Sequence, residues 1–92
     1  MGDLMDDARI EELLSLYRTM GDRRARNQVV EAHLEVSRFT ISRFARRNPS
    51  LADDLRQVAL MAIVNAAARY RPGKGASFKT FARRTIDGEL KR

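Results

Sequence analysis

The 92-residue sequence contains no cysteine and a single histidine. Without cysteine the chain has neither a disulfide framework nor a thiolate metal site, so its stability has to come from packing. His33 has no other histidine or cysteine at the spacing of metal ligands, which favours a surface or helix-packing role over coordination. We therefore expect neither a metal nor another cofactor.

Long apolar runs are also absent. The acidic N-terminal segment MGDLMDDARIEELL lacks the apolar stretch of a signal peptide, and no window approaches the roughly 18 apolar residues of a membrane span. These features predict a soluble, cytoplasmic protein without a membrane partner. A basic C-terminal helix lying on an anionic membrane surface stays as a minor alternative.

The sequence offers no constellation of catalytic side chains. Gly73-Lys74-Gly75 lacks the glycine spacing and the following Ser or Thr of a phosphate-binding loop. Asp53 and Asp54 are adjacent, so on a helix they diverge and are poorly placed to share a proton. No serine or threonine belongs to a motif that supplies a base and an orienting group. We predict that the protein is not an enzyme.

Charge is abundant but uneven. Residues 1–68 hold ten basic and ten acidic side chains, whereas residues 69–92 hold eight basic and two acidic ones, so the net charge of +6 lies at the C-terminal end. Fifteen of the eighteen basic residues are arginine, whose planar guanidinium suits phosphates and base edges. This asymmetry favours a nucleic-acid partner, with a merely solvated helix face as the alternative.

Apolar periodicity predicts a single all-α domain of four helices. The first helix, from Asp7 to Met20, is ended by Gly21, and the second begins at the cap Asp22 and ends at Asn48 and Pro49. The inward residues of the first are Ile10, Leu13, Leu14 and Tyr17, and those of the second are Val30, Leu34, Ile41 and Phe44 or Ala45. The domain is thus divided into a first-helix segment at 1–21, a second helix at 22–48, a third helix at 51–70, and a loop with the last helix at 71–92.

The third helix, from Leu51 to about Tyr70, is expected to open with a capping box made by Ser50 and Asp53. Its middle, residues 58–64, is apolar on every side, which is typical of a central helix or of one that binds a partner. Small residues at Ala59, Ala62 and Ala66 would allow another helix to approach closely.

A loop at residues 71–76 and a cap at Ser77 precede the last helix. The apolar stripe of this helix comprises Phe78, Phe81 or Ala82, Thr85 or Ile86, and Glu89 or Leu90. Basic residues flank it at Lys79, Arg83, Arg84, Lys91 and Arg92. Aromatic rings and cations therefore alternate along the C-terminal segment, which suits a single strand that offers both bases and phosphates.

Three segments resemble a known family. DLRQV at 54–58 and AAARYRP at 66–72 resemble the core-binding segment of bacterial sigma factors, DLxQVGxxGLxxAxxRFDP. SFKTFA at 77–82 and TIDGELKR at 85–92 resemble the melting segment of stress-response and sporulation sigma factors, FxTYAxPTIxGEIKR. RNQVVEAHL at 26–34 is similar to RNxLVExHL. Order and spacing agree across residues 10–92, so the chain resembles sigma-factor domain two.

This resemblance implies a role in transcription initiation with two partners. The third helix would contact the clamp coiled coil of core RNA polymerase through Asp53, Asp54, Gln57, Leu60 and Val64. The last helix and its loop would bind the unwound non-template strand of the minus-ten promoter element through Lys74, Phe78, Lys79, Thr80, Phe81, Arg83, Arg84, Lys91 and Arg92. Alternatively, Leu60, Val64, Phe78 and Phe81 belong to the core, as we expect of Tyr70.

Some positions depart from the family pattern. Ala59 and Ala62 stand where glycines are usual, Arg71 replaces the aspartate before proline, and Arg83-Arg84 replaces an apolar residue and proline. Base capture is therefore expected to differ in detail. The chain ends within the promoter-recognition helix, which predicts an excised domain or a truncated protein, with the excised domain favoured. A second hypothesis is an interaction module held inactive by an anti-sigma factor.

Overall fold

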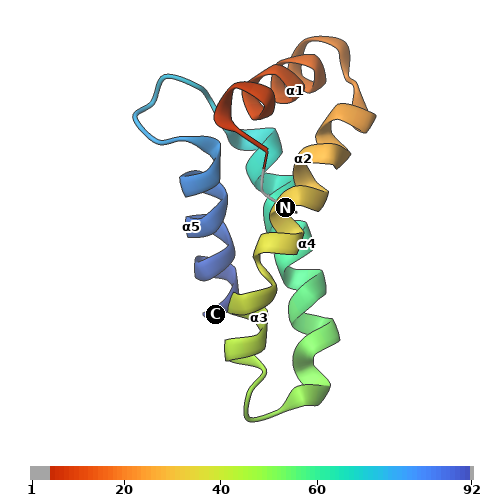
Figure 1. Ribbon diagram of the computed structural model, residues 1–92, viewed down its shortest axis with the longest axis vertical. Coiled ribbons are helices and arrows are strands. Elements are labelled where there is room, and N and C mark those ends of the chain that lie inside the picture. Colours follow the sequence, from red (N-terminus) through yellow and green to blue (C-terminus); the bar gives the residue numbers. More distant parts are fainter. Residues whose placement is uncertain (1–4, 92) are drawn as a thin grey trace.

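The computed structural model describes residues 5–91 and has five α-helices and one short 3-10 turn in that range (Figure 1). The elements are α1 (Asp7–Met20), α2 (Arg23–Val36), α3 (Arg38–Phe44), η1 (Pro49–Leu51), α4 (Ala52–Arg69) and α5 (Phe78–Leu90). The all-α fold predicted from the sequence is confirmed. None of these helices is both long and apolar enough to cross a bilayer.

α1 has the bounds that its sequence predicts. The side chain of Asp6 accepts a hydrogen bond of 2.8 Å from the backbone N–H of Arg9 at the start of the helix. At the other end Gly21 has a φ of 67°, and its N–H donates to the carbonyl of Tyr17. A left-handed residue at this position satisfies carbonyls that the last turn would otherwise leave free.

Gly21 provides a test of this termination. Gly21→Ala is expected to destabilise the protein by about 1 kcal/mol, because a Cβ disfavours the left-handed conformation by roughly that amount. Gly88→Ala is the matched control: Gly88 lies inside α5 and an added Cβ would meet no atom within 4 Å. The control should stabilise the protein by about 0.5–1 kcal/mol. Urea denaturation measures both, and equal effects would contradict the assignment.

The predicted second helix is interrupted, and this is a correction to the sequence analysis. Asp22 caps α2 as expected, accepting 3.1 Å from the N–H of Ala25. However, α2 ends at Val36, and α3 begins after Ser37. The Ser37 hydroxyl donates to the carbonyl of Leu34 at 2.7 Å, an interaction that bends helices. After the break Ala45 is buried and Phe44 is exposed, so Ala45 is the inward residue of the two that the sequence left open.

The predicted capping box before α4 is wrong. Pro49 starts the 3-10 turn η1, so Ser50 lies inside that turn and the N-cap residue of α4 is Leu51, which makes no side-chain cap. The Ser50 hydroxyl instead donates to the side-chain oxygen of Asn48 at 2.6 Å. The rest of α4 agrees with the expected helix to within a residue at each end.

The core is divided into two clusters along α4. One joins α1, the start of α2, the end of α4 and the start of α5, and it includes Leu14, Val29, Tyr70 and Phe78. The other joins α2, α3, the middle of α4 and the end of α5 around Ile63. α4 and α5 form the most extensive helix contact, and α1 lies across the end of the bundle where α4 finishes (Figure 1).

Candidate functional site

The exposed side of α5 is basic because its apolar residues recur at helical spacing and occupy the inward side. Phe78, Ala82, Ile86 and Leu90 recur every four residues and are all buried. This orientation leaves Arg83, Arg84 and Lys91 exposed, while Lys79, Thr80 and Phe81 are half-buried. Lys74 is exposed in the preceding loop. Ser77 caps the helix as expected, accepting 3.3 Å from the N–H of Thr80. Arg92 lies outside the described residues.

The aromatic residues of this segment differ in accessibility. Phe78 is 1% exposed, and its ring packs edge-on against the rings of His33 and Tyr70 at centroid distances of 4.9 and 5.3 Å. Stacking a base on Phe78 would require it to leave the core, so the packing alternative holds for it. Phe81 is half-buried, with its ring 5.8 Å from that of Tyr70. Among the candidate aromatics, Phe81 is the accessible one.

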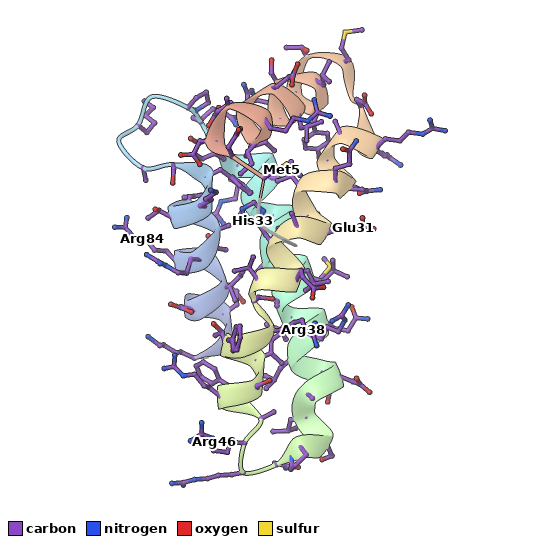
Figure 2. The ribbon with its side chains drawn as sticks, in the orientation of Figure 1. Met5, Glu31, His33, Arg38, Arg46 and Arg84 are labelled. Atoms are coloured by element: carbon purple, nitrogen blue, oxygen red, sulfur yellow. The ribbon has the colours of Figure 1, made fainter. Side chains whose placement is uncertain are left out.

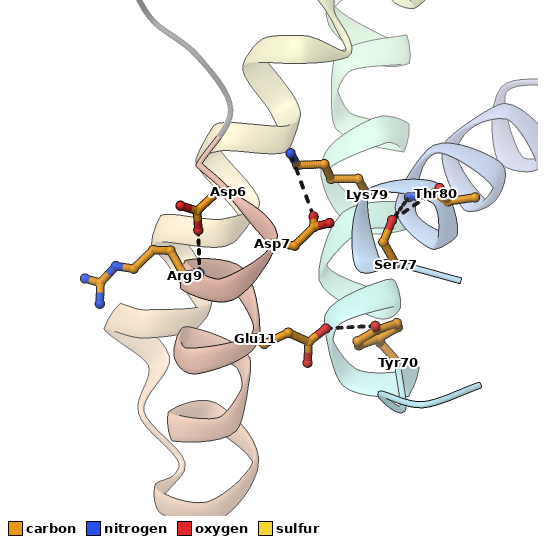
Figure 3. A network of polar contacts seen from close by, with 8 residues as sticks. All are labelled: Asp6, Asp7, Arg9, Glu11, Tyr70, Ser77, Lys79 and Thr80. Carbon is orange, nitrogen blue, oxygen red and sulfur yellow. Dashed lines mark hydrogen bonds and ion pairs between the residues drawn. The ribbon is translucent and has the colours of Figure 1, made fainter. Parts of the chain in front are cut away.

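Acidic residues of α1 contact the C-terminal end of α4 and the first turn of α5 (Figure 3). The Tyr70 hydroxyl donates to the carboxylate of Glu11 at 2.8 Å. Burial and this hydrogen bond raise the pKa of Tyr70 to about 12, so the phenol stays protonated at neutral pH. The ammonium of Lys79 lies 3.8 Å from the carboxylate of Asp7. Sequence analysis missed Asp7 and Glu11, because contacts between such distant segments leave no local pattern.

A hollow of about 240 Å³ separates α5 from α2 and α3. Its lining residues are His33, Val36, Ser37, Thr40, Lys79, Arg83, Ile86 and Asp87. Figure 2 shows His33 between α2 and α5, with Arg84 on the outer side of α5. The hollow thus joins a basic helix face to the break between α2 and α3.

His33 is buried and neutral at this hollow. Its Nδ1 lies 2.8 Å from the carbonyl of Val29, so this nitrogen carries the proton and donates it. Burial lowers the pKa of the imidazole, and the positive charge of Lys79 lowers it further, against the raising effect of the hydrogen bond to Val29. Nε2 has no hydrogen-bond partner in the described part of the chain. Of the two roles expected for His33, on the surface or in helix packing, the structure shows the packing role.

The candidate residues on α4 form a second, less basic surface. Asp53, Asp54 and Gln57 are exposed, whereas Leu60 and Val64 are half-buried and pack against the second core cluster. Beside them is a shallow hollow of about 310 Å³ lined by Gln57, Val58, Met61, Ala62, Asn65 and Glu89. Met61 is 56% exposed and Val58 36%. Sequence analysis recognised the apolar run but did not single out these two residues.

The described residues include no group of three or more histidine, aspartate or glutamate side chains arranged to hold a metal ion. The arrangement can instead bind through surfaces: exposed guanidinium groups on α5, a half-buried aromatic ring beside them, and an apolar and acidic strip on α4.

Comparison with known proteins places these surfaces in a family context. Residues 29–92 match the family described as Sigma-70 region 2. The chain is 39% identical over 69 residues to the RNA polymerase sigma-F factor of Kitasatospora aureofaciens, which covers 75% of this chain and 23% of that protein. It is 34% identical over 83 residues to the RNA polymerase sigma-B factor of Bacillus subtilis, covering 90% and 31%.

A further relative is the RNA polymerase sigma factor SigF of Mycobacterium tuberculosis, 39% identical over 69 residues, which are 75% of this chain and 26% of the relative. The chain therefore spans about a quarter to a third of the length of the curated relatives it matches. No solved structure gives a significant match.

Proposed function

The chain belongs to the Sigma-70 region 2 family, and on that premise we propose that it acts in transcription initiation by binding core RNA polymerase and promoter DNA. In this proposal α4 docks on the clamp coiled coil, and α5 with its loop holds the melted non-template strand of the minus-ten element. The domain contributes no catalytic group, since the polymerase carries out the chemistry. The role implies a cytoplasmic location.

The geometry of α4 supports the polymerase part. Asp53, Gln57, Leu60 and Val64 are spaced by four, three and four residues, so they share one face within roughly 60° of each other. An exposed amide and carboxylate followed by half-buried apolar side chains supply hydrogen bonds and apolar area along one line. A helix of a partner laid along this line would meet all four.

The geometry of α5 supports the DNA part. Arg83, Arg84 and Lys91 are exposed and make no ion pair within residues 5–91, so their charges are available to phosphates. Phe81 offers part of a ring three residues before Arg84, on a neighbouring part of the helix surface, and bases stack on aromatic rings without strong sequence preference. The observation that carries the proposal is that one small domain presents cations on α5 that are unpaired within residues 5–91, together with an apolar and acidic strip on α4.

The polymerase part is tested with a clamp coiled-coil fragment. Gln57→Ala is expected to weaken binding about five- to tenfold, since a hydrogen bond lost from a desolvated interface costs about 1–1.5 kcal/mol. Gln28→Ala, an exposed glutamine on α2, is the matched control and should bind normally. Isothermal titration calorimetry gives both affinities. Absence of binding, or equal weakening by the two changes, would contradict the docking assignment.

A second candidate function is favoured by the exposure of Val58 and Met61 next to Gln57. These apolar side chains widen the contact strip beyond the predicted residues, which suits an inhibitory protein of the anti-sigma type covering the same face. Such a protein would compete with the clamp fragment in the same titration. Binding of both partners at once would exclude a shared face.

A further inference from the structure

α3 and the turn that follows it form a second basic surface, separate from α5. No acidic residue occurs between Val36 and Ala52, while this segment contains four arginines. Two of its aromatic residues are exposed: Phe39 is 83% exposed and Phe44 39%. An exposed phenylalanine ring among guanidinium groups offers a stacking face beside positive charges.

Most of these arginines have no internal partner. Arg38 pairs with Glu35 at 2.6 Å, with both side chains largely exposed. Arg43, Arg46 and Arg47 are exposed and form no ion pair with any residue in the range 5–91. Figure 2 shows Arg46 projecting on the same side of the molecule as Arg84 of α5. One free arginine of each segment is therefore directed toward the same side in this view.

The hollow between α5 and the α2–α3 break connects the two surfaces. Lys79 and Arg83 line it from α5, and Thr40 lines it from α3. Phe39 and Arg43 lie on one side of α3, four residues apart, and Arg46 follows in the turn after the helix. Phe39 lines an adjoining hollow with Glu35, Val36, Arg38 and Ser42. Val36 lines both hollows, so the two are neighbours at the end of α2.

We propose that α3 extends the strand-binding surface: a single-stranded nucleic acid held by α5 continues past the hollow, with a base stacked on Phe39 and phosphates near Arg43 and Arg46. The inference rests on the proposed function of α5. A single strand is favoured because its bases and phosphates match the alternation of ring and guanidinium groups. An anionic membrane would instead need a broad apolar helix face, which this short helix of seven residues lacks.

The test compares oligonucleotides of two lengths on the full chain by fluorescence anisotropy. α5 has 13 residues and is about 20 Å long, which about six stacked nucleotides cover, whereas about 14 nucleotides reach both helices. Phe39→Ala is expected to weaken binding of the longer oligonucleotide about tenfold and to leave the shorter unaffected. Arg43→Ala with Arg46→Ala should also make the salt dependence of the longer one shallower, by about 0.7 in logarithmic slope per lost phosphate contact.

Matched controls separate the two proposals. Met20→Ala, at a 75% exposed apolar residue of α1, and Arg24→Ala should affect neither oligonucleotide. Arg84→Ala should weaken both, and its failure to do so would overturn the α5 assignment. If Arg84→Ala acts and the α3 variants change nothing, the α3 inference alone is overturned. Phe39-dependent binding to anionic vesicles without oligonucleotide binding, or Phe39-dependent self-association, would also overturn it.

Discussion

Phe78→Ala is expected to lower the free energy of unfolding by about 3–5 kcal/mol, the cost of removing a large aromatic side chain from a packed core. Phe78 is 1% exposed and its ring contacts those of His33 and Tyr70, so truncation leaves a cavity where α2, α4 and α5 meet. A chain of this size is stable by only about 5–14 kcal/mol. Chemical denaturation measures the loss, and a fall in melting temperature of more than 10 °C is expected.

Phe39→Ala is the matched control for this change. The same side chain is removed, but Phe39 is 83% exposed, so the free energy of unfolding should change by no more than about 0.5 kcal/mol. A contradicting result would be a Phe78→Ala change that lowers the free energy of unfolding as little as Phe39→Ala does but weakens binding of single-stranded DNA. The ring of Phe78 would then be a stacking surface for bases and not part of the core.

Reversing both charges of the arginine pair on α5 should have the largest effect on DNA binding. Arg83→Glu with Arg84→Glu is expected to lower affinity for a single-stranded minus-ten oligonucleotide about 10- to 100-fold at low salt. The reason is that each exposed contact between an arginine and a phosphate contributes about 0.2–1 kcal/mol, and each new carboxylate repels phosphate by a similar amount. Because both side chains are exposed, folding should be retained, which circular dichroism checks.

Arg23 and Arg24 provide a control of identical charge. They form another adjacent, exposed arginine pair, at the start of α2. Replacing both by glutamate changes the net charge by the same amount, so a general electrostatic effect would lower DNA affinity as much as the α5 change does. If the site is local to α5, the α2 change should lower DNA affinity clearly less than the α5 change. The unmodified chain should also bind single-stranded DNA more tightly than duplex DNA.

Local chemistry made much of this fold predictable from the sequence. Gly21, Asp22 and Ser77 terminate or cap helices through interactions with neighbours at most five residues away, so the sequence alone is sufficient to identify them. Likewise, the buried stripe of α5 follows from four-residue spacing. Such features require no knowledge of how the helices pack.

Other features depended on competing local choices or on tertiary contacts. Ser37 breaks the second predicted helix through a hydroxyl bond to Leu34, which apolar periodicity does not reveal. Pro49 favours a 3-10 turn that places Ser50 away from the capping position. Phe78 fits both the aromatic pattern of a stacking site and a core stripe, and only packing decides between them. The basic α3 surface was hidden because its arginines were counted together with the acidic residues of α1.

The alanines between α4 and α5 have a mechanical consequence. Ala59, Ala62 and Ala66 on α4 and Ala82 on α5 are all fully buried, which lets the two backbones lie close together over the most extensive helix contact of the described chain. A close-packed interface transmits the displacement of one helix to its neighbour, so α5 is expected to move together with α4. The orientation of α5 is therefore set as soon as α4 is fixed, and a nucleic-acid strand on α5 would be positioned by whatever holds α4.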